Sequence, residues 1–134
     1  MKCHLNFVPE DSGWETAVVE KLERMDEVVA YVKNQGLNFR IPYAFEGRPG
    51  NYFPDLILKV DDGRGMTDLL HLIVEVSGQD LKEKQAKVET AKSMWVPAVN
   101  NERRFGRWAF VELDRPDFAM QTIRKYLKAH AAVQ

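Results

Sequence analysis

Residues 53–78 read FPDLILKVDDGRGMTDLLHLIVEVSG, and this stretch decides the fold. Its two apolar runs flank a glycine-containing turn, which predicts two strands joined by that turn. The even-numbered positions of both runs are aliphatic: Leu56, Leu58, Val60, Leu70, Leu72, Val74 and Val76. Because successive side chains of a strand point to opposite faces, these positions predict one shared core face. Asp55, Glu75 and Ser77 then project from the other face, with the two acids as neighbours.

The length and charge of the chain limit its class. A chain of 134 residues is the size of one ordinary domain with a single core. Its 19 Lys and Arg residues almost balance 20 Asp and Glu residues, so contact with nucleic acid would need a local basic patch. Cys3 is the sole cysteine, the three histidines lack zinc spacing, and no run suits a signal peptide or membrane span. We therefore expect a soluble, cytoplasmic protein.

The rest of the chain alternates between strand and helix patterns. Apolar spacing and turn residues predict strands at residues 2–9, 37–45 and 107–113, and helices at residues 11–36, 78–95 and 114–130. Residues 24–26 could mark a kink or the start of a second short helix within 11–36. Residues 46–51 predict a turn, and residues 95–106 a mixed connection. This order predicts an α/β or α+β fold, with one layer of sheet covered by helices.

Two neighbouring carboxylates need a positive partner. Each raises the pKa of the other unless a positive charge lies between them. Mg²⁺ prefers oxygen ligands, keeps several waters, and is commonly held by one or two carboxylates plus a substrate phosphate. Such a metal can activate water and stabilise the charge that develops on a phosphodiester under attack. Asp55 and Glu75 therefore predict a magnesium site, and a nearby lysine would orient the water or neutralise the phosphate.

The spacing of Pro54-Asp55 and Glu75-Val76-Ser77 resembles the PD-(D/E)xK nuclease motif, with Ser77 in place of the final lysine. A longer set of segments is more specific: HLNFV, DSGWE, VVAYVKNQGLNFRIPY, NYFPDLIL, LIVEVSG, WVPAVNN and FGRWAFVEL. Over about residues 3 to 113, this set resembles the C-terminal nuclease domain of type III restriction enzyme Res subunits and of related DEAD/DEAH-box helicase-like proteins.

The resemblance implies a restriction-endonuclease-like fold, in which helices flank a central mixed sheet, and Mg²⁺-dependent cleavage of double-stranded DNA, with Mn²⁺ as an alternative metal. It also implies that residues 1–134 form one nuclease-like domain, the C-terminal part of a longer protein with an ATP-driven helicase or translocase. The chain has no GxxxxGK[ST] phosphate-binding loop, so ATP hydrolysis would belong to that other domain.

The family's site residues can be matched to this sequence. The resemblance assigns Asp55 and Glu75 as the two metal-binding, catalytic acids, and the Val76 carbonyl as a further metal ligand. Glu15 matches an acid of the first helix that often completes the metal shell. Ser12 and Glu15 also form a capping-box pattern, which accounts for Glu15 without a metal.

Because Ser77 cannot act as the missing lysine, another residue would have to. In this superfamily the lysine can move to the following helix, where Lys87 is the first candidate and Lys84 the second. Lys59, on the same strand face as Asp55, is the third. Lys84 is also a candidate for DNA contact, as are Arg103 and Arg104, although basic turns are often only solvated.

Two other interpretations stay open. If nothing replaces the lysine, the same fold would serve as an inactive DNA-binding or docking module attached to a motor protein. The acids could also serve only the structure of a small domain.

Overall fold

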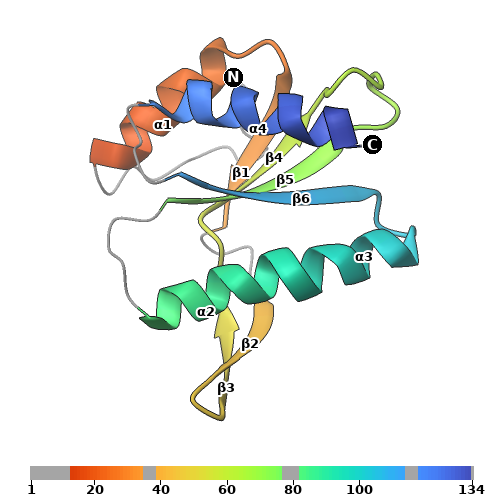
Figure 1. Ribbon diagram of the computed structural model, residues 1–134. Coiled ribbons are helices and arrows are strands. Elements are labelled where there is room, and N and C mark those ends of the chain that lie inside the picture. The colour runs from red at the N-terminus through yellow and green to blue at the C-terminus, as the bar shows by residue number, and fades with distance from the viewer. Residues whose placement is uncertain (1–12, 35–38, 77–81, 114–117, 134) are drawn as a thin grey trace.

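A mixed four-stranded sheet lies at the centre of the computed structural model, which describes residues 13–34, 39–76, 82–113 and 118–133 (Figure 1). The side chains of residues 13–16, 82–83 and 131–133 are outside this description. The strand order is β1 (Val28–Lys33), β4 (Leu56–Val60), β5 (Leu70–Val76) and β6 (Arg107–Leu113). Only the β5–β6 pair is parallel. The predicted mixed sheet flanked by helices is therefore confirmed, whereas the strand predicted at residues 2–9 lies outside the described residues.

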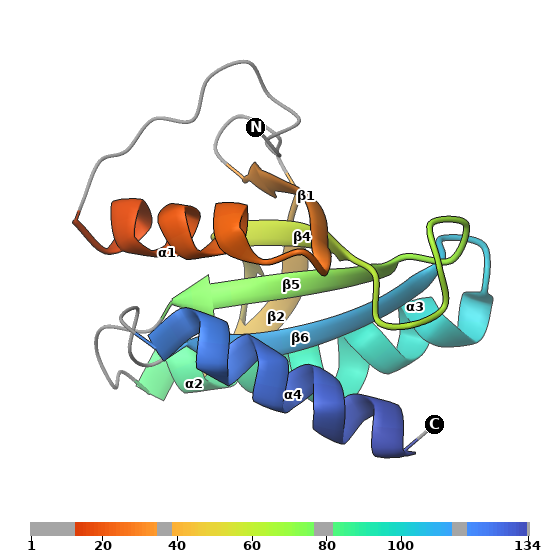
Figure 2. The same ribbon diagram turned by 90° about the horizontal axis from the view of Figure 1, so that it is seen from above.

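The even face of the sheet carries the main core. In the register of β4 with β5, Leu56 pairs with Val74 and Leu58 with Leu72, so the even positions of both strands share one face. Helices α1 (Gly13–Arg24) and α4 (Ala119–Val133) lie across this face, as Figure 2 shows. The predicted core face of residues 53–78 is confirmed.

The odd face carries a second, smaller core. A continuous helical rod of α2 (Lys82–Thr90), a π-helical turn η1 (Ala91–Trp95) and α3 (Val96–Glu102) lies along it (Figure 1). Beside α2 stands a separate hairpin of β2 (Ile41–Phe45) and β3 (Arg48–Tyr52). Residues from the rod, the hairpin and the sheet form this core: Ile41, Tyr52, Ile73, Val88, Ala91 and Phe110. Both faces of the sheet are thus covered.

The long helix predicted at residues 11–36 is wrong in its second half. Helix α1 ends at Arg24, and Val28–Lys33 form β1, which pairs antiparallel with β4. The valines that fitted a helical stripe, Val29 and Val32, also have the branched side chains that favour a strand. Pairing with β4 decides for a strand over a helix, because the strand extends the sheet under α1.

Two shorter predictions also need correction. The predicted turn at residues 46–51 is only the pair Glu46 and Gly47, whose φ angles of 51° and 77° suit a two-residue hairpin turn, and the strand resumes at Arg48. The predicted connection at residues 95–106 is helical to Glu102. A π-helical bond from the Val96 N–H to the Ala91 carbonyl precedes Pro97, which lacks the N–H that an α-helix would use.

Candidate functional site

Asp55 and Glu75 lie next to each other at one end of the two central strands. Asp55 directly precedes β4, Glu75 is the penultimate residue of β5, and the strands are antiparallel. The Asp55 backbone N–H donates to Glu75 Oε1 at 3.3 Å, and Asp55 Oδ2 accepts from the Val76 N–H at 2.9 Å. The structure therefore brings together the two acids that the alternation placed on one face.

The Glu75 carboxylate is almost entirely removed from water. Glu75 is only 6% exposed, and its Oε1 accepts a 2.6 Å hydrogen bond from the Tyr52 hydroxyl. Burial raises the pKa of Glu75, and the nearby Asp55 raises it further. Burial and Glu75 likewise raise the pKa of Tyr52, so Tyr52 stays a hydrogen-bond donor. The site therefore holds an acid whose negative charge is costly without a cation.

Lys84 supplies a cation at this site. It lies in α2, and its Nζ is 3.2 Å from Glu75 Oε2 and donates to the Val76 carbonyl at 3.0 Å. The ammonium thus bridges a carboxylate oxygen and a backbone carbonyl oxygen, the two kinds of oxygen that Mg²⁺ binds in proteins. In the described part of the chain, no three His, Cys, Asp or Glu side chains gather as a metal-binding group. The cation at this position contacts the Glu75 carboxylate and the Val76 carbonyl.

One comparison with known proteins identifies a family for this chain. A family model described as an endonuclease domain matches residues 2–99, most of the chain, and the match includes the Asp55, Glu75 and Lys84 site. The chain belongs to this endonuclease-domain family. No curated protein and no solved structure matches it.

The other two lysine candidates of the endonuclease domain make different contacts. Lys87 lies one turn after Lys84, and its Nζ lies 5.5 Å from the centre of the Tyr43 ring. Lys59 pairs with His71 in the β4–β5 register, toward the opposite end of the strands from Asp55. Lys84 contacts Glu75, although the sequence favoured Lys87.

Two predicted positions cannot be placed. Ser77 lies outside the described residues, and the Glu15 side chain lies outside the described side chains. The metal role of Glu15 stays a prediction.

Sequence reasoning overlooked two residues beside the acids of the endonuclease domain. Tyr52 ends β3 and donates to Glu75, but NYFPD by itself suggests only an ordinary strand tyrosine. Glu112 pairs with Glu75 in the parallel register of β5 and β6, and its charge helps raise the pKa of Tyr52. The alternation of residues 107–113 places Glu112 on the face of Trp108 and Phe110, but only the strand order brings that face beside Glu75.

The predicted arginine contacts lie at the opposite end of β6 from Glu112. Arg103 and Arg104 are exposed after α3, and Arg104 forms a 2.8 Å ion pair with Glu102. Arg103 also borders a surface pocket of about 460 Å³, lined by Asp68, Asn100, Arg103, Gly106, Arg107, Trp108 and His130. The two arginines are accessible to a nucleic acid, and their predicted role in DNA binding stays untested.

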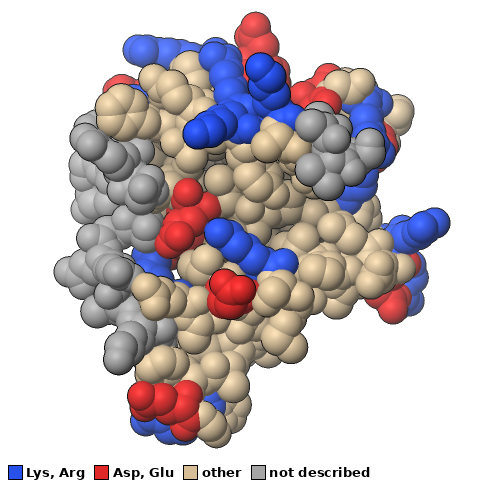
Figure 3. Space-filling model, viewed as in Figure 1, with Lys and Arg blue, Asp and Glu red and all other residues tan. Residues whose placement is uncertain are grey.

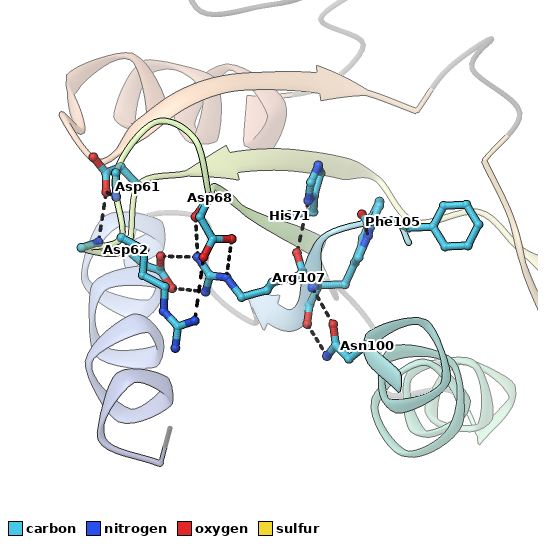
Figure 4. Close-up of polar contacts among 11 residues, drawn as sticks. Asp61, Asp62, Asp68, His71, Asn100, Phe105 and Arg107 are labelled. Carbon is cyan, nitrogen blue, oxygen red and sulfur yellow. Dashed lines mark hydrogen bonds and ion pairs between the residues drawn. The ribbon is translucent and has the colours of Figure 1, made fainter. Parts of the chain in front are cut away.

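Arg107 belongs to a structural network at this end (Figure 4). Its guanidinium makes two 2.8 Å hydrogen bonds to the Asp62 carboxylate and one of 3.0 Å to Asp68. The Arg107 carbonyl lies 3.2 Å from His71 Nδ1, and the His71 ring stacks on Trp108. Ion pairs with two acids leave Arg107 poorly suited to bind a phosphate.

Proposed function

We propose that this endonuclease domain cleaves double-stranded DNA with a Mg²⁺ ion, or Mn²⁺ in its place, held by Asp55, Glu75 and the Val76 carbonyl. The contact of the Lys84 ammonium with Glu75 and Val76 carries the proposal, because it marks oxygens that already accept a cation. Two carboxylates and a carbonyl suit Mg²⁺, which keeps several waters and takes substrate phosphate as a further ligand. When bound, the metal would supply an activated water and offset charge on the phosphodiester.

We assign to Lys84 the role for which the sequence favoured Lys87. Lys84 lies in the first turn of α2, and its ammonium already contacts Glu75. A lysine there can place its positive charge beside the scissile phosphate and stabilise the negative charge of the transition state. If Lys84 fills this role from α2, the position of Ser77 does not have to supply the lysine of the motif.

The deciding experiment measures DNA cleavage by the chain and four variants. With Mg²⁺ or Mn²⁺, we expect Asp55→Ala and Glu75→Ala to abolish cleavage, and EDTA to do the same. We expect Lys84→Ala to slow cleavage by about 10² or more, in the range of one lost electrostatic contact. Lys87→Ala is the matched control, since it removes the same charge one turn away, and should stay within a few-fold of the native rate.

Each outcome separates the alternatives. Cleavage that survives both acid substitutions would refute the metal site. Cleavage lost in Lys87→Ala but kept in Lys84→Ala would return the role to Lys87. Binding of DNA without cleavage in either metal, also in the presence of the motor domain, would favour the inactive DNA-binding module.

We further propose that the domain acts as the cleavage module of a type III restriction or helicase–nuclease system, as the C-terminal part of a longer chain. The resemblance of residues 3 to 113 to Res subunits supports this context. The test is co-purification: the domain should form a complex with, or be covalently part of, an ATPase that translocates on DNA.

A further inference from the structure

We propose that Tyr52 is a positioning residue that fixes the Glu75 carboxylate for metal binding; the inference rests on the metal site of the proposed function. The Tyr52 hydroxyl donates to Glu75 Oε1 at 2.6 Å, and both residues are buried, with 4% and 6% exposed. Hydrogen bonds from a hydroxyl to a charged carboxylate in such surroundings are short and strong. A bond of this kind can determine which way a carboxylate turns.

The two oxygens of Glu75 have different partners. Oε1 accepts from the Tyr52 hydroxyl and from the Asp55 N–H, whereas Oε2 contacts the Lys84 ammonium. Two hydrogen-bond donors thus hold Oε1 in place. Oε2 faces the Lys84 ammonium. The Tyr52 bond therefore keeps Oε2 directed toward the position that a metal would share with the Val76 carbonyl.

The position of the Tyr52 ring is fixed by the second core. Tyr52 pairs with Ile41 across the β2–β3 hairpin, and its ring lies 6.5 Å from that of Phe110 on β6. The hairpin is not part of the main sheet, so Tyr52 brings a separate element to the acids. Docking of this hairpin thereby becomes a condition for an ordered Glu75. Groups that orient metal ligands typically change metal affinity by 10-fold to 100-fold when removed.

The test compares Tyr52→Phe with Tyr31→Phe. Each substitution removes one oxygen from a buried tyrosine and keeps the ring, and Tyr31 donates to Glu23 in the opposite core. Mn²⁺ binding is measured by titration calorimetry, and circular dichroism verifies that both variants fold. We expect Tyr52→Phe to weaken Mn²⁺ binding about 10-fold or more. Tyr31→Phe should bind as the native chain does.

A kinetic measurement gives a second readout. In Tyr52→Phe, the metal concentration for half-maximal cleavage should rise about 10-fold, while the rate at saturating metal stays within a few-fold. A general loss of stability would instead lower the rate at every metal concentration.

The outcomes distinguish this inference from the proposed function. If native protein binds Mn²⁺ and loses it in Glu75→Ala, but Tyr52→Phe binds equally well, the metal site stands and the role of Tyr52 is refuted. An equal loss of affinity in Tyr31→Phe would also refute it. If native protein binds no Mn²⁺ at all, the metal site and the role of Tyr52 both fall.

Discussion

Glu75 is a charged residue in a position where charge is costly. Its side chain is buried beside Asp55, and the Lys84 ammonium contacts it from α2. The Lys84 ammonium offsets part of the cost of burying this carboxylate. The remaining cost of burial is expressed in the raised pKa of Glu75.

Glu75→Gln should make the metal-free protein more stable. Because the pKa of Glu75 is raised in the folded state, the native protein holds this proton more tightly than the unfolded chain does. The native protein consequently loses stability as the pH rises above about 4.5, the ordinary value, whereas Glu75→Gln does not. Urea unfolding in EDTA from pH 4 to pH 8 measures the difference, which should grow with pH.

The exposed Glu89 of α2 gives the matched control for this prediction. Glu89→Gln removes the same charge and should leave the free energy of unfolding almost unchanged. Adding Mg²⁺ should reduce the difference in the free energy of unfolding between the native protein and Glu75→Gln, because a ligand that binds the folded native protein stabilises it. A Glu75→Gln protein less stable than native at pH 8 would contradict the assigned pKa direction.

At the scale of elements, Arg107 connects the β4–β5 loop to the start of β6. Its side chain is 20% exposed and that of Asp62 only 5%, so the pair is largely shielded from water. The guanidinium lowers the pKa of Asp62 by hydrogen bonding, and the two parallel bonds fix the loop in one geometry. This network lies at the end of the strands away from Glu75, and we expect it to serve stability alone.

Arg107→Ala should destabilise the fold by about 2 kcal/mol, because it leaves the Asp62 carboxylate without its partner. Since the pKa of Asp62 is lowered in the folded state, this contribution is complete above about pH 4 and disappears as the pH falls through the folded pKa. Urea unfolding at pH 7 and pH 3 measures both effects. Arg104→Ala, which breaks an exposed pair, should cost almost nothing, and an equal loss in both variants would contradict the assignment.

The whole molecule has almost no net charge, and its surface shows no single basic face in the view of Figure 3. There, Lys and Arg side chains are interspersed with Asp and Glu, and much of the surface between α4 and the α2–α3 rod is uncharged. No helix in the described part of the chain is both long and apolar enough to cross a membrane. With a net charge of -1, binding of DNA by this domain would have to use a local basic patch and not a global field.

Removal of Arg103 and Arg104 tests where the phosphate contacts lie. Each phosphate contact adds about 0.9 to the slope of log K against log salt, so Arg103→Ala with Arg104→Ala should reduce that slope by about 2. Fluorescence anisotropy with labelled duplex DNA between 50 and about 200 mM salt measures it. The matched control removes two exposed cations of α4, Lys125→Ala with Lys128→Ala. An equal reduction of the slope by both double variants would show that the arginines act only through their charge and not through defined phosphate contacts.

The local pattern of residues 53–78 was enough to predict the two central strands, their shared core face and the adjacency of Asp55 and Glu75. Alternation has a period of two, so a single stretch of sequence specifies which side chains share a face. The predicted strand at residues 107–113 and the last helix also follow from local patterns, the helix from the start signal at residues 114–117. These inferences need only contacts between residues close in sequence or joined by one turn.

Tertiary structure alone decided the remaining features. Val28–Lys33 became a strand because β4 offered an unpaired edge, and no local pattern reveals that partner. Lys84 contacts Glu75, whereas Lys87 lies over the Tyr43 ring. The angle at which α2 crosses the sheet determines which face of the helix meets the acids. Tyr52 reaches Glu75 because the second core docks the hairpin there. Sequence by itself determined the acids of this endonuclease domain, and long-range packing determined which side chains surround them.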